Sequence, residues 1–309
     1  MGVTTVAAGG SLARLTGWTL SPVALRRLAV ASVVANVGIV VTGGAVRLSG
    51  SGLGCPTWPR CSGDSLVPSS HISIHKLIEF GNRSLTFVLG VVLLATFVAA
   101  WRQRTQVRLA LVSLLGVPAQ AVLGGIVVLT HLNPWLVAAH FLLSAGLIGV
   151  TMLLWWRLSG RALVAVPPVG VALARGLAVI TAAVLAIGTV VTGTGPHAGD
   201  LDEDGRLHRI HLSPAGVSQL HADAVMVLIG ATVGMLALVY AVHGLVVLRR
   251  AVLVLLGIEL AQGVIGYTQY FLHVPALLVG FHMLGACLVW LAALRVLLMV
   301  DTAKSPRPS

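Results

Sequence analysis

The sequence is poor in charged residues, which make up only 9% of its 309 positions. Soluble globular proteins carry about 25% charged residues, so this composition excludes an ordinary water-soluble domain. Hydrophobic residues make up 57% of the chain, and they gather into long runs. We therefore predict an integral membrane protein.

Acidic residues are especially scarce, with nine against 20 lysines and arginines, and the formal net charge is +11. The basic residues are scattered singly or in pairs between apolar runs and form no patch with interleaved aromatic residues. Such a pattern argues against a nucleic-acid partner and indicates topology signals in a lipid bilayer. A phosphate-binding glycine loop and a dinucleotide fingerprint are also absent, so we expect neither ATP nor NAD.

Eight apolar segments are long enough to cross about 30 Å of hydrocarbon. They lie near residues 28–47, 75–100, 108–130, 135–156, 172–193, 217–245, 250–269 and 276–299. Arginines and lysines concentrate in every second connection, so the positive-inside rule places both termini in the cytoplasm and the loops 48–74 and 194–216 outside. Residues 1–27 lack the apolar core of a cleaved signal peptide, which predicts an uncleaved first helix.

The two halves of the sequence resemble each other at an offset of 142 residues. The letters QAVLG at 120–124 match QGVIG at 262–266, and His140 matches His282. Repeats of equal orientation are related by an axis along the membrane normal. We predict an all-α membrane fold of two tandem four-helix bundles. Its parts are a tail 1–27, an N-terminal bundle 28–160, a linker 161–171, a C-terminal bundle 172–300 and a tail 301–309.

Histidines within the apolar segments are the first candidates for a functional site, because polar residues there are costly and usually face the bundle interior. His140 and His282 occupy matching places, and His221 lies early in the sixth segment. Two imidazoles on facing helices of a bundle are a natural pair of axial ligands for haem iron. Any one of them alone is more simply a packed, hydrogen-bonded residue, but the repetition favours ligation.

Other histidines have simpler explanations. His131 and His273 also match between the halves, but they fall in short turns that water can reach, so we expect a boundary role. The long outer loop holds a cluster of histidines and acidic residues. We expect these residues to be solvated and not to bind a metal, because they lack a compact ligand spacing. This group is His197, Asp200, Asp202, Glu203, Asp204, His208 and His211.

The second segment begins with the densest group of ionisable residues in any apolar run. At 3.6 residues per turn these side chains share one helical face. A carboxylate there costs about 2.5–3.5 kcal/mol on insertion scales, unless the helix end lies among the headgroups. Two interpretations of this group are possible from the sequence: a helix end among the headgroups, or a functional site. The residues are His75, Glu79, Asn82 and Arg83.

Cys55 and Cys61 lie in a polar loop that the topology places outside. An oxidising compartment favours a disulfide over a zinc site, which would need two further ligands. The pair is either a structural clip or redox-active. Basic residues near the outer ends can bind haem propionates or simply reach the interface. They are Arg47, Arg60, Lys76, Arg83, Arg206 and Arg209.

Taken together, these motifs resemble the haem A synthase family. The resemblance rests on VTGGAVRLSGSGLGCPTWP at 41–59, EFGNR at 79–83, VTGTGPHAGD at 191–200 and the histidines, and it covers about 28–300. It implies an enzyme of the bacterial cell membrane that oxidises the ring-D methyl group of haem O to the formyl group of haem A. Haem b is the implied cofactor. The implied partners are haem O synthase, cytochrome oxidase assembly factors and further copies of the chain.

The resemblance also implies roles for individual residues. His221 and His282 would be axial ligands of the haem b iron, and His140 would face the substrate haem. Glu79 matches a carboxylate thought to take part in the oxidation. Cys55 and Cys61 match the outer cysteine pair of the family.

Asn82 departs from the family pattern, because many members have a histidine directly before the arginine of this motif. An amide is a poor iron ligand, so either His75, on the same face, replaces it or His140 acts alone. The alternative function is a di-haem b-type electron carrier, similar to cytochrome b561, which gives no special use to Glu79 or the cysteine loop. A transporter or assembly factor without haem is a third class.

Overall fold

The computed structural model of the chain describes residues 21–62, 65–68, 73–198 and 208–302. Within these residues it contains eight helices that are long and apolar enough to cross a membrane, which confirms the all-α prediction. They are α2 (Pro22–Leu48), α3 (Ile74–Arg102), α4 (Val107–Leu129), α5 (Pro134–Leu158), α6 (Pro168–Thr194), α7 (Pro214–Ala241), α8 (Val246–Phe271) and α9 (Ala276–Met299).

Hydroxyl caps and prolines define where several helices begin. The side chains of Ser21, Ser73 and Ser213 each accept a hydrogen bond from a backbone N–H in the first turn of the helix that follows. Such caps satisfy donors that have no partner inside the helix. A proline in the first turn, where no N–H is needed, opens four of the helices: Pro22, Pro134, Pro168 and Pro214.

Two turns at matching places support the internal repeat. His131 and Leu132, between α4 and α5, have φ values of 50° and 58°. His273 and Val274, between α8 and α9, have φ values of 59° and 61°. Non-glycine residues are uncommon in this left-handed region. The same rare conformation at positions 142 residues apart therefore indicates that the two halves share their structure at these turns. Both histidines are exposed in these turns, as the boundary interpretation predicts.

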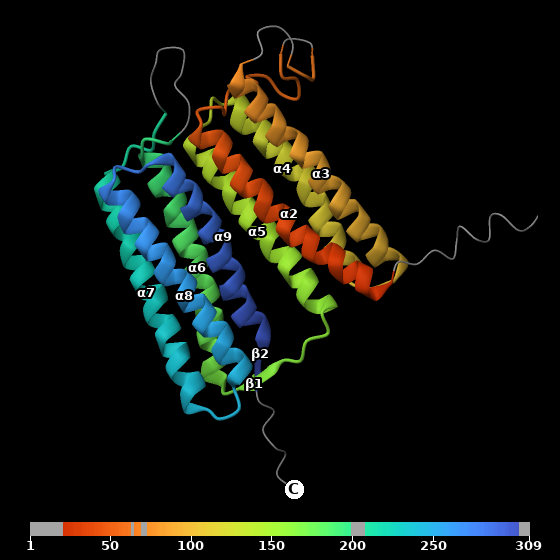
Figure 1. Cartoon of the computed structure of the whole chain (residues 1–309), viewed down its shortest axis with the longest axis vertical. Helices are drawn as coiled ribbons and strands as arrows, with labels where there is room; N and C mark the ends of the chain where they lie inside the picture. The colour runs from red at the N-terminus through yellow and green to blue at the C-terminus, as the bar shows by residue number, and fades with distance from the viewer. Residues whose placement is uncertain (1–20, 63–64, 69–72, 199–207, 303–309) are drawn as a thin grey trace, which may run out of the picture.

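The helices form two sets of consecutive neighbours, as Figure 1 shows. In the first set α2 packs on α3 and α5, and α4 packs on α3 and α5; in the second set α6 packs on α7 and α9, and α8 packs on α7 and α9. The sets meet through α2, α5, α6 and α9. The end that carries residues 22, 102–107, 158–168, 241–246 and 299–302 is called the basic end below. The opposite end is called the cysteine-loop end.

Three contacts hold the two sets together. Trp290 Nε1 on α9 donates a hydrogen bond of 2.8 Å to the backbone oxygen of Ala145 on α5. The buried Cys287 of α9 packs with Val40 of α2 and Ile148 of α5. At the cysteine-loop end, a guanidinium nitrogen of Arg47 donates 2.7 Å to the carbonyl oxygen of Ala198.

Two details at the basic end differ from the sequence prediction. A short parallel pair joins β1 (Val164–Val166), in the expected linker, to β2 (Val300–Thr302), where the expected bundle 172–300 meets the tail 301–309. Helix α7 ends at Ala241 and α8 begins at Val246, although the apolar residues between them suggested a longer α7 and a later α8. The chain turns there because Gly244 adopts a φ of 85°, which glycine permits at no steric cost.

Candidate functional site

His221 of α7 and His282 of α9 face each other within the second set of helices. Their ring centroids are 6.4 Å apart, with an angle of 69° between the ring planes. Each ring lies against a glycine of a neighbouring helix, which allows the close approach. A Cβ on Gly188 of α6 would lie 3.1 Å from Cε1 of His221, and one on Gly266 of α8 would lie 3.5 Å from Cε1 of His282.

The geometry of this pair fits axial ligation of a haem iron. An ion bound by one nitrogen of each ring would hold the centroids roughly 6 Å apart, because metal–imidazole bonds are about 2.0 Å long. The Nδ1 atoms of both rings are buried without a hydrogen-bond partner in the described part of the chain. Buried nitrogens normally have hydrogen-bond partners. The Nδ1 atoms of both rings are therefore left with hydrogen-bonding capacity that the described protein atoms do not use. The structure brings together the two residues that the sequence predicted as ligands.

His140 of α5 repeats this arrangement in the first set of helices. A Cβ on Gly124 of α4 would lie 3.1 Å from its Cε1 atom, and its Nδ1 is again buried without a partner among the described residues. No ring contact or hydrogen bond joins His140 to a second histidine in the described ranges. Among the described residues of the first set, no second imidazole faces His140 as His282 faces His221 in the second set.

Asn82 occupies the place where a second histidine was expected. It lies on α3 next to Gly43 of α2, much as His221 on α7 lies next to Gly188 of α6. Its Oδ1 atom accepts a hydrogen bond of 2.7 Å from Thr42 Oγ1. The amide is thus held against α2 by a specific contact.

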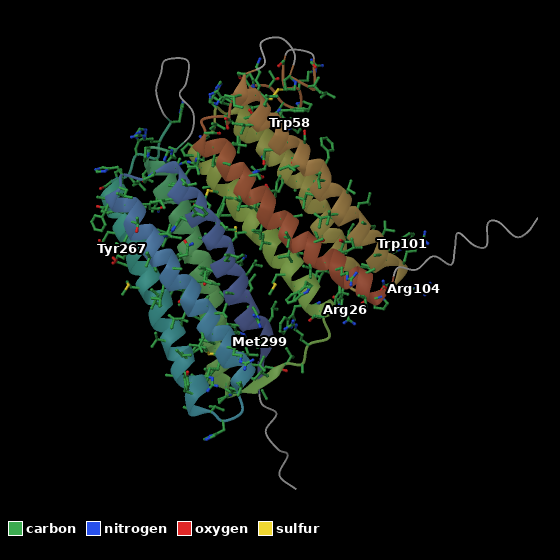
Figure 2. All side chains as sticks on the ribbon, viewed as in Figure 1. Arg26, Trp58, Trp101, Arg104, Tyr267 and Met299 are labelled. Atoms are coloured by element: carbon green, nitrogen blue, oxygen red, sulfur yellow. A yellow bond between two sulfur atoms is a disulfide. The ribbon has the colours of Figure 1, made fainter. Side chains whose placement is uncertain are left out.

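A disulfide joins Cys55 to Cys61 at the cysteine-loop end, as the sequence predicted. Both residues are buried, with 0% and 1% of their surface exposed. Trp58, labelled in Figure 2, lies between them in the sequence and packs on Gly125 of α4, where it leaves no room for a Cβ. The loop therefore reaches from α3 to the helix that also contacts His140.

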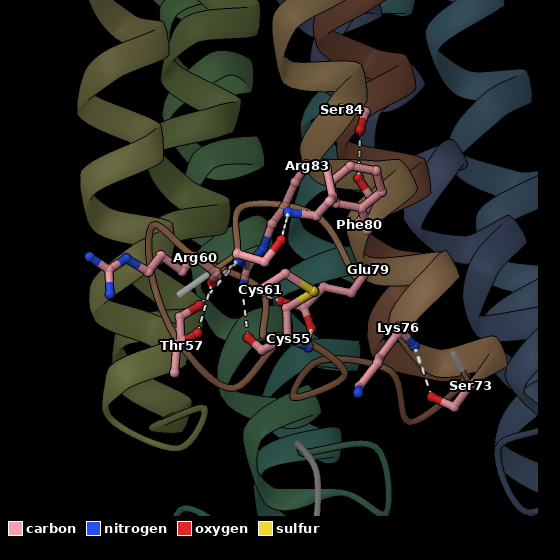
Figure 3. Close-up of a disulfide and its surroundings, with 12 residues drawn as sticks. Cys55, Thr57, Arg60, Cys61, Ser73, Lys76, Glu79, Phe80, Arg83 and Ser84 are labelled. Atoms are coloured by element: carbon pink, nitrogen blue, oxygen red, sulfur yellow. Dashed lines mark hydrogen bonds and ion pairs between the residues drawn. A yellow bond between two sulfur atoms is a disulfide. The ribbon is translucent and has the colours of Figure 1, made fainter. Parts of the chain in front are cut away.

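Glu79 and Arg83 bind this loop, as Figure 3 shows. One carboxylate oxygen of the buried Glu79 accepts a hydrogen bond of 2.5 Å from the backbone N–H of Cys55. The other oxygen forms an ion pair of 2.5 Å with Arg83. Arg83 also donates to the backbone oxygens of Cys55, Thr57 and Arg60 at 2.8, 3.1 and 3.2 Å. Sequence reasoning placed the pair on one face but did not find these contacts.

His75 also contacts the loop, and no ring contact or hydrogen bond in the described part of the chain joins it to His140. Its Nδ1 atom forms a hydrogen bond of 2.9 Å with Ser51 Oγ. Gly54 packs so closely on the carbonyl of His75 that a Cβ would lie 2.5 Å from the oxygen. On the expected common face, His75, Glu79 and Arg83 bind the loop, whereas Asn82 binds α2.

The outer loop of the second half is described only in part. His197 Nε2 forms a hydrogen bond of 2.9 Å with the backbone oxygen of Val274, so this histidine anchors the loop to the α8–α9 turn. Asp200, Asp202, Glu203, Asp204 and Arg206 lie outside the described residues. No group of three potential metal ligands occurs among the residues that are described.

Sequence reasoning missed Glu259 of α8, a carboxylate with only 2% of its surface exposed. Its Oε1 accepts 2.9 Å from Thr232 Oγ1, while its buried Oε2 has no partner in the described structure. A glutamate inside an apolar segment is itself a signal, since such residues are rare in the membrane. The glycines beside the three histidines were also missed.

Comparison with known proteins gives the family. The sequence profile of a family described as "Cytochrome oxidase assembly protein" matches residues 26–294, from the start of α2 almost to the end of α9. This chain belongs to the cytochrome oxidase assembly protein family. The match includes the cysteine loop, Glu79 and the three half-buried histidines His140, His221 and His282, so the whole candidate site lies inside the shared region.

Relatives in this family are similar over shorter stretches. A protein named "Heme A synthase" from Geobacillus thermodenitrificans is 35% identical over 116 residues, 36% of either chain. Proteins of the same name from Lysinibacillus sphaericus and Bacillus licheniformis are 35% and 30% identical over 125 and 126 residues. These stretches cover 39% of this chain and 40% and 41% of the relatives, so the similar part spans less than half of each protein.

Proposed function

We propose that this chain converts haem O to haem A by oxidising the ring-D methyl group to a formyl group, and so supplies haem A to terminal oxidases. The observation that carries the proposal is the facing pair His221 and His282, with His140 held in the same way in the other half. The printed name of the relatives, "Heme A synthase", supports the same activity.

The second set of helices is proposed to hold haem b, whose iron His221 and His282 would bind. When bound there, the haem supplies one-electron redox chemistry. The protein fixes the two imidazoles on separate helices, and Gly188 and Gly266 leave the space in which the rings lie. Both rings are half-buried, and their Nδ1 atoms are shielded from water.

The first set of helices is proposed to bind the substrate haem through His140. The side chain of His75 is hydrogen-bonded to Ser51, and that of Asn82 is hydrogen-bonded to Thr42. We therefore propose neither of them as a second ligand of the substrate iron. His140 then acts as the only histidine ligand, and the opposite side of the substrate is left for the oxidation. Arg83, whose charge is paired with Glu79, lies at the same end of the helices and is proposed to contact the carboxylates of the substrate haem.

Glu79 is proposed as the catalytic carboxylate, and its contacts add a positioning task. The carboxylate holds the backbone of Cys55, and through Arg83 it also holds Thr57 and Arg60. The cysteine loop is thereby fixed over the end of α3, and Trp58 is directed toward α4. We propose that the disulfide is a clip for this loop.

The surroundings of the enzyme are proposed from the charge pattern. The basic end and both termini are proposed to lie on the cytoplasmic side of a bacterial cell membrane. The cysteine loop then lies on the oxidising outer side. We propose that the two sets of helices act as the separate bundles 28–160 and 172–300. Haem O synthase and cytochrome oxidase assembly factors are the proposed partners, and association with further copies of the chain remains part of the proposal.

Co-expression with a haem O synthase tests the activity. Haems are extracted from the membranes and separated by chromatography, with an empty vector as the reference. We expect haem A only where this chain is present. Unchanged haem O, without an alcohol or formyl product, would refute the proposed reaction.

Matched histidine variants test the ligand assignment in the same membranes. His282→Ala is expected to remove the b-type absorption spectrum, because the iron loses an axial ligand. His273→Ala changes an exposed histidine in the neighbouring turn and is expected to leave the spectrum intact. Loss of the spectrum in both variants, or in neither, would contradict the assignment.

A further inference from the structure

A cavity of about 380 Å³ lies between the two sets of helices, away from the proposed haem residues. Its volume falls within the range of about 300–1,000 Å³ that is common for small-molecule sites. Its walls come from α2, α5, α8 and α9 and are almost entirely apolar. Figure 1 shows that α2 and α9 lie close at the cysteine-loop end and diverge toward the basic end.

The cavity contains two guanidinium groups near the basic end, Arg161 and Arg295. The Nε atom of Arg295 is buried without a hydrogen-bond partner in the described part of the chain. Arg161 lies over the ring of Trp155, with its Cζ atom 5.2 Å from the ring centroid. Neither arginine forms an ion pair with a carboxylate of the described residues.

Arg161 is exposed, whereas the Nε atom of Arg295 is buried without a partner among the described residues. Leaving a buried donor unpaired is costly, and two guanidinium groups in one cavity match the oxygens of a phosphate, which each can bind in a bidentate way. The nearby walls offer no carboxylate, because the other lining residues are aliphatic, aromatic or methionine. The charged end of the cavity therefore favours a phosphate or phosphodiester.

The apolar walls continue from the arginines toward the middle of the membrane. On α9 they extend from Arg295 to Leu288, about 10 Å at 1.5 Å per residue. One leaflet of hydrocarbon is roughly 15 Å deep, so the walls follow most of an acyl chain. On α2, Val30 and Val34 are 45% and 64% exposed along the same cavity. A free phosphate would leave these walls uncovered.

We propose that this cavity binds a phospholipid with an anionic headgroup. Its phosphate lies against Arg161 and Arg295, and an acyl chain lies between α2 and α8, which do not pack directly on each other. Basic pockets between membrane helices at the cytoplasmic side are suited to such headgroups. The lipid fills the wedge between the two sets of helices and does not depend on the haem chemistry.

Native mass spectrometry of the delipidated full chain in zwitterionic detergent tests this site. Phosphatidylglycerol, phosphatidylcholine and inorganic phosphate are added separately. We expect one tightly bound phosphatidylglycerol and at least tenfold weaker binding of the other two. Equal binding of phosphatidylcholine, or binding of inorganic phosphate as tight as that of phosphatidylglycerol, would overturn the proposal.

Two pairs of variants locate the lipid. The double variant Arg161→Gln, Arg295→Gln should weaken phosphatidylglycerol binding at least tenfold, whereas Arg108→Gln, at the basic end of α4, should not. Val254→Trp fills the apolar wall on α8 without touching either arginine, and Val247→Trp changes an exposed valine outside the cavity. Binding should fall in the first of these and persist in the second. Unchanged phosphatidylglycerol affinity in both the double variant and Val254→Trp contradicts the site. If one of these two variants does not fold, the affinity measured for the other decides the question alone.

Discussion

The attachment of the cysteine loop to α3 leads to a quantitative prediction about the disulfide. Cys55 and Cys61 are buried, so a reductant reaches their sulfur atoms only when the loop opens. Glu79 opposes this opening by accepting a hydrogen bond from the Cys55 backbone. If the loop closes faster than it is reduced, the reduction rate follows the population of the open form.

The size of the effect follows from the hydrogen bond that joins Glu79 to the loop, because Glu79 and Arg83 both lie on α3 and their pair does not break when the loop opens. A hydrogen bond to a charged group contributes about 1.5–3 kcal/mol. Glu79→Ala should then favour opening by about 2 kcal/mol, which is roughly thirtyfold in the reduction rate. Glu79→Gln keeps an oxygen for the Cys55 N–H but loses the charge, so a smaller increase of roughly threefold is expected.

The assay measures the rate at which the purified protein reacts with a thiol-alkylating mass tag during incubation with dithiothreitol. Asp223→Asn serves as the control, because this carboxylate bonds to Gln219 on α7 and does not contact the loop. Its rate should equal that of the parent protein. Equal rates in Glu79→Ala and the parent would show that Glu79 does not hold the loop, and the positioning task proposed for it would be wrong.

Three further predictions concern the helices. Gly188→Ala should weaken haem b binding more than Gly266→Ala, because its Cβ would lie closer to the histidine ring, at 3.1 Å against 3.5 Å; haem titration of both variants checks this order. Asn82→His should add a second imidazole to the first set of helices and raise the share of low-spin haem in the absorption spectrum; an unchanged spectrum in haem-loaded protein argues against Asn82 as the missing ligand position. Glu259→Gln should leave the thermal midpoint in detergent close to that of the parent, because it keeps the size of the side chain and an acceptor for Thr232, whereas Glu259→Ala should lower it by opening a cavity; equal midpoints in the two variants would contradict this.

Features that depend on composition and periodicity were predictable from the sequence. The eight helices follow from apolar runs that only a membrane can accommodate, and their observed starts differ by a few residues where Pro22 and Pro168 open the helices earlier. The pairing of His221 with His282 was predicted from their places in the repeat and from the resemblance to a known family. The disulfide followed from the outward topology of its loop.

Features that depend on three-dimensional approach were not predictable in the same way. Glu79 and the Cys55 backbone are 24 positions apart, and no sequence pattern shows that the loop folds back on α3. The β1–β2 pair joins residues from opposite ends of the second half, so its partners are visible only once the helices are packed. Gly124, Gly188 and Gly266 look like ordinary small residues until the neighbouring rings are placed.

The mass of the haem bound to the purified protein tests the central claim most directly. Protein isolated from cells that make haem O is compared with the Glu79→Gln and His140→Ala variants after extraction of the haems. The parent should carry haem in which the substrate has gained one oxygen and lost two hydrogens, as a methyl group becomes a formyl group, and both variants should carry less of it. Haem O recovered without any oxidised form from the parent protein would contradict the account.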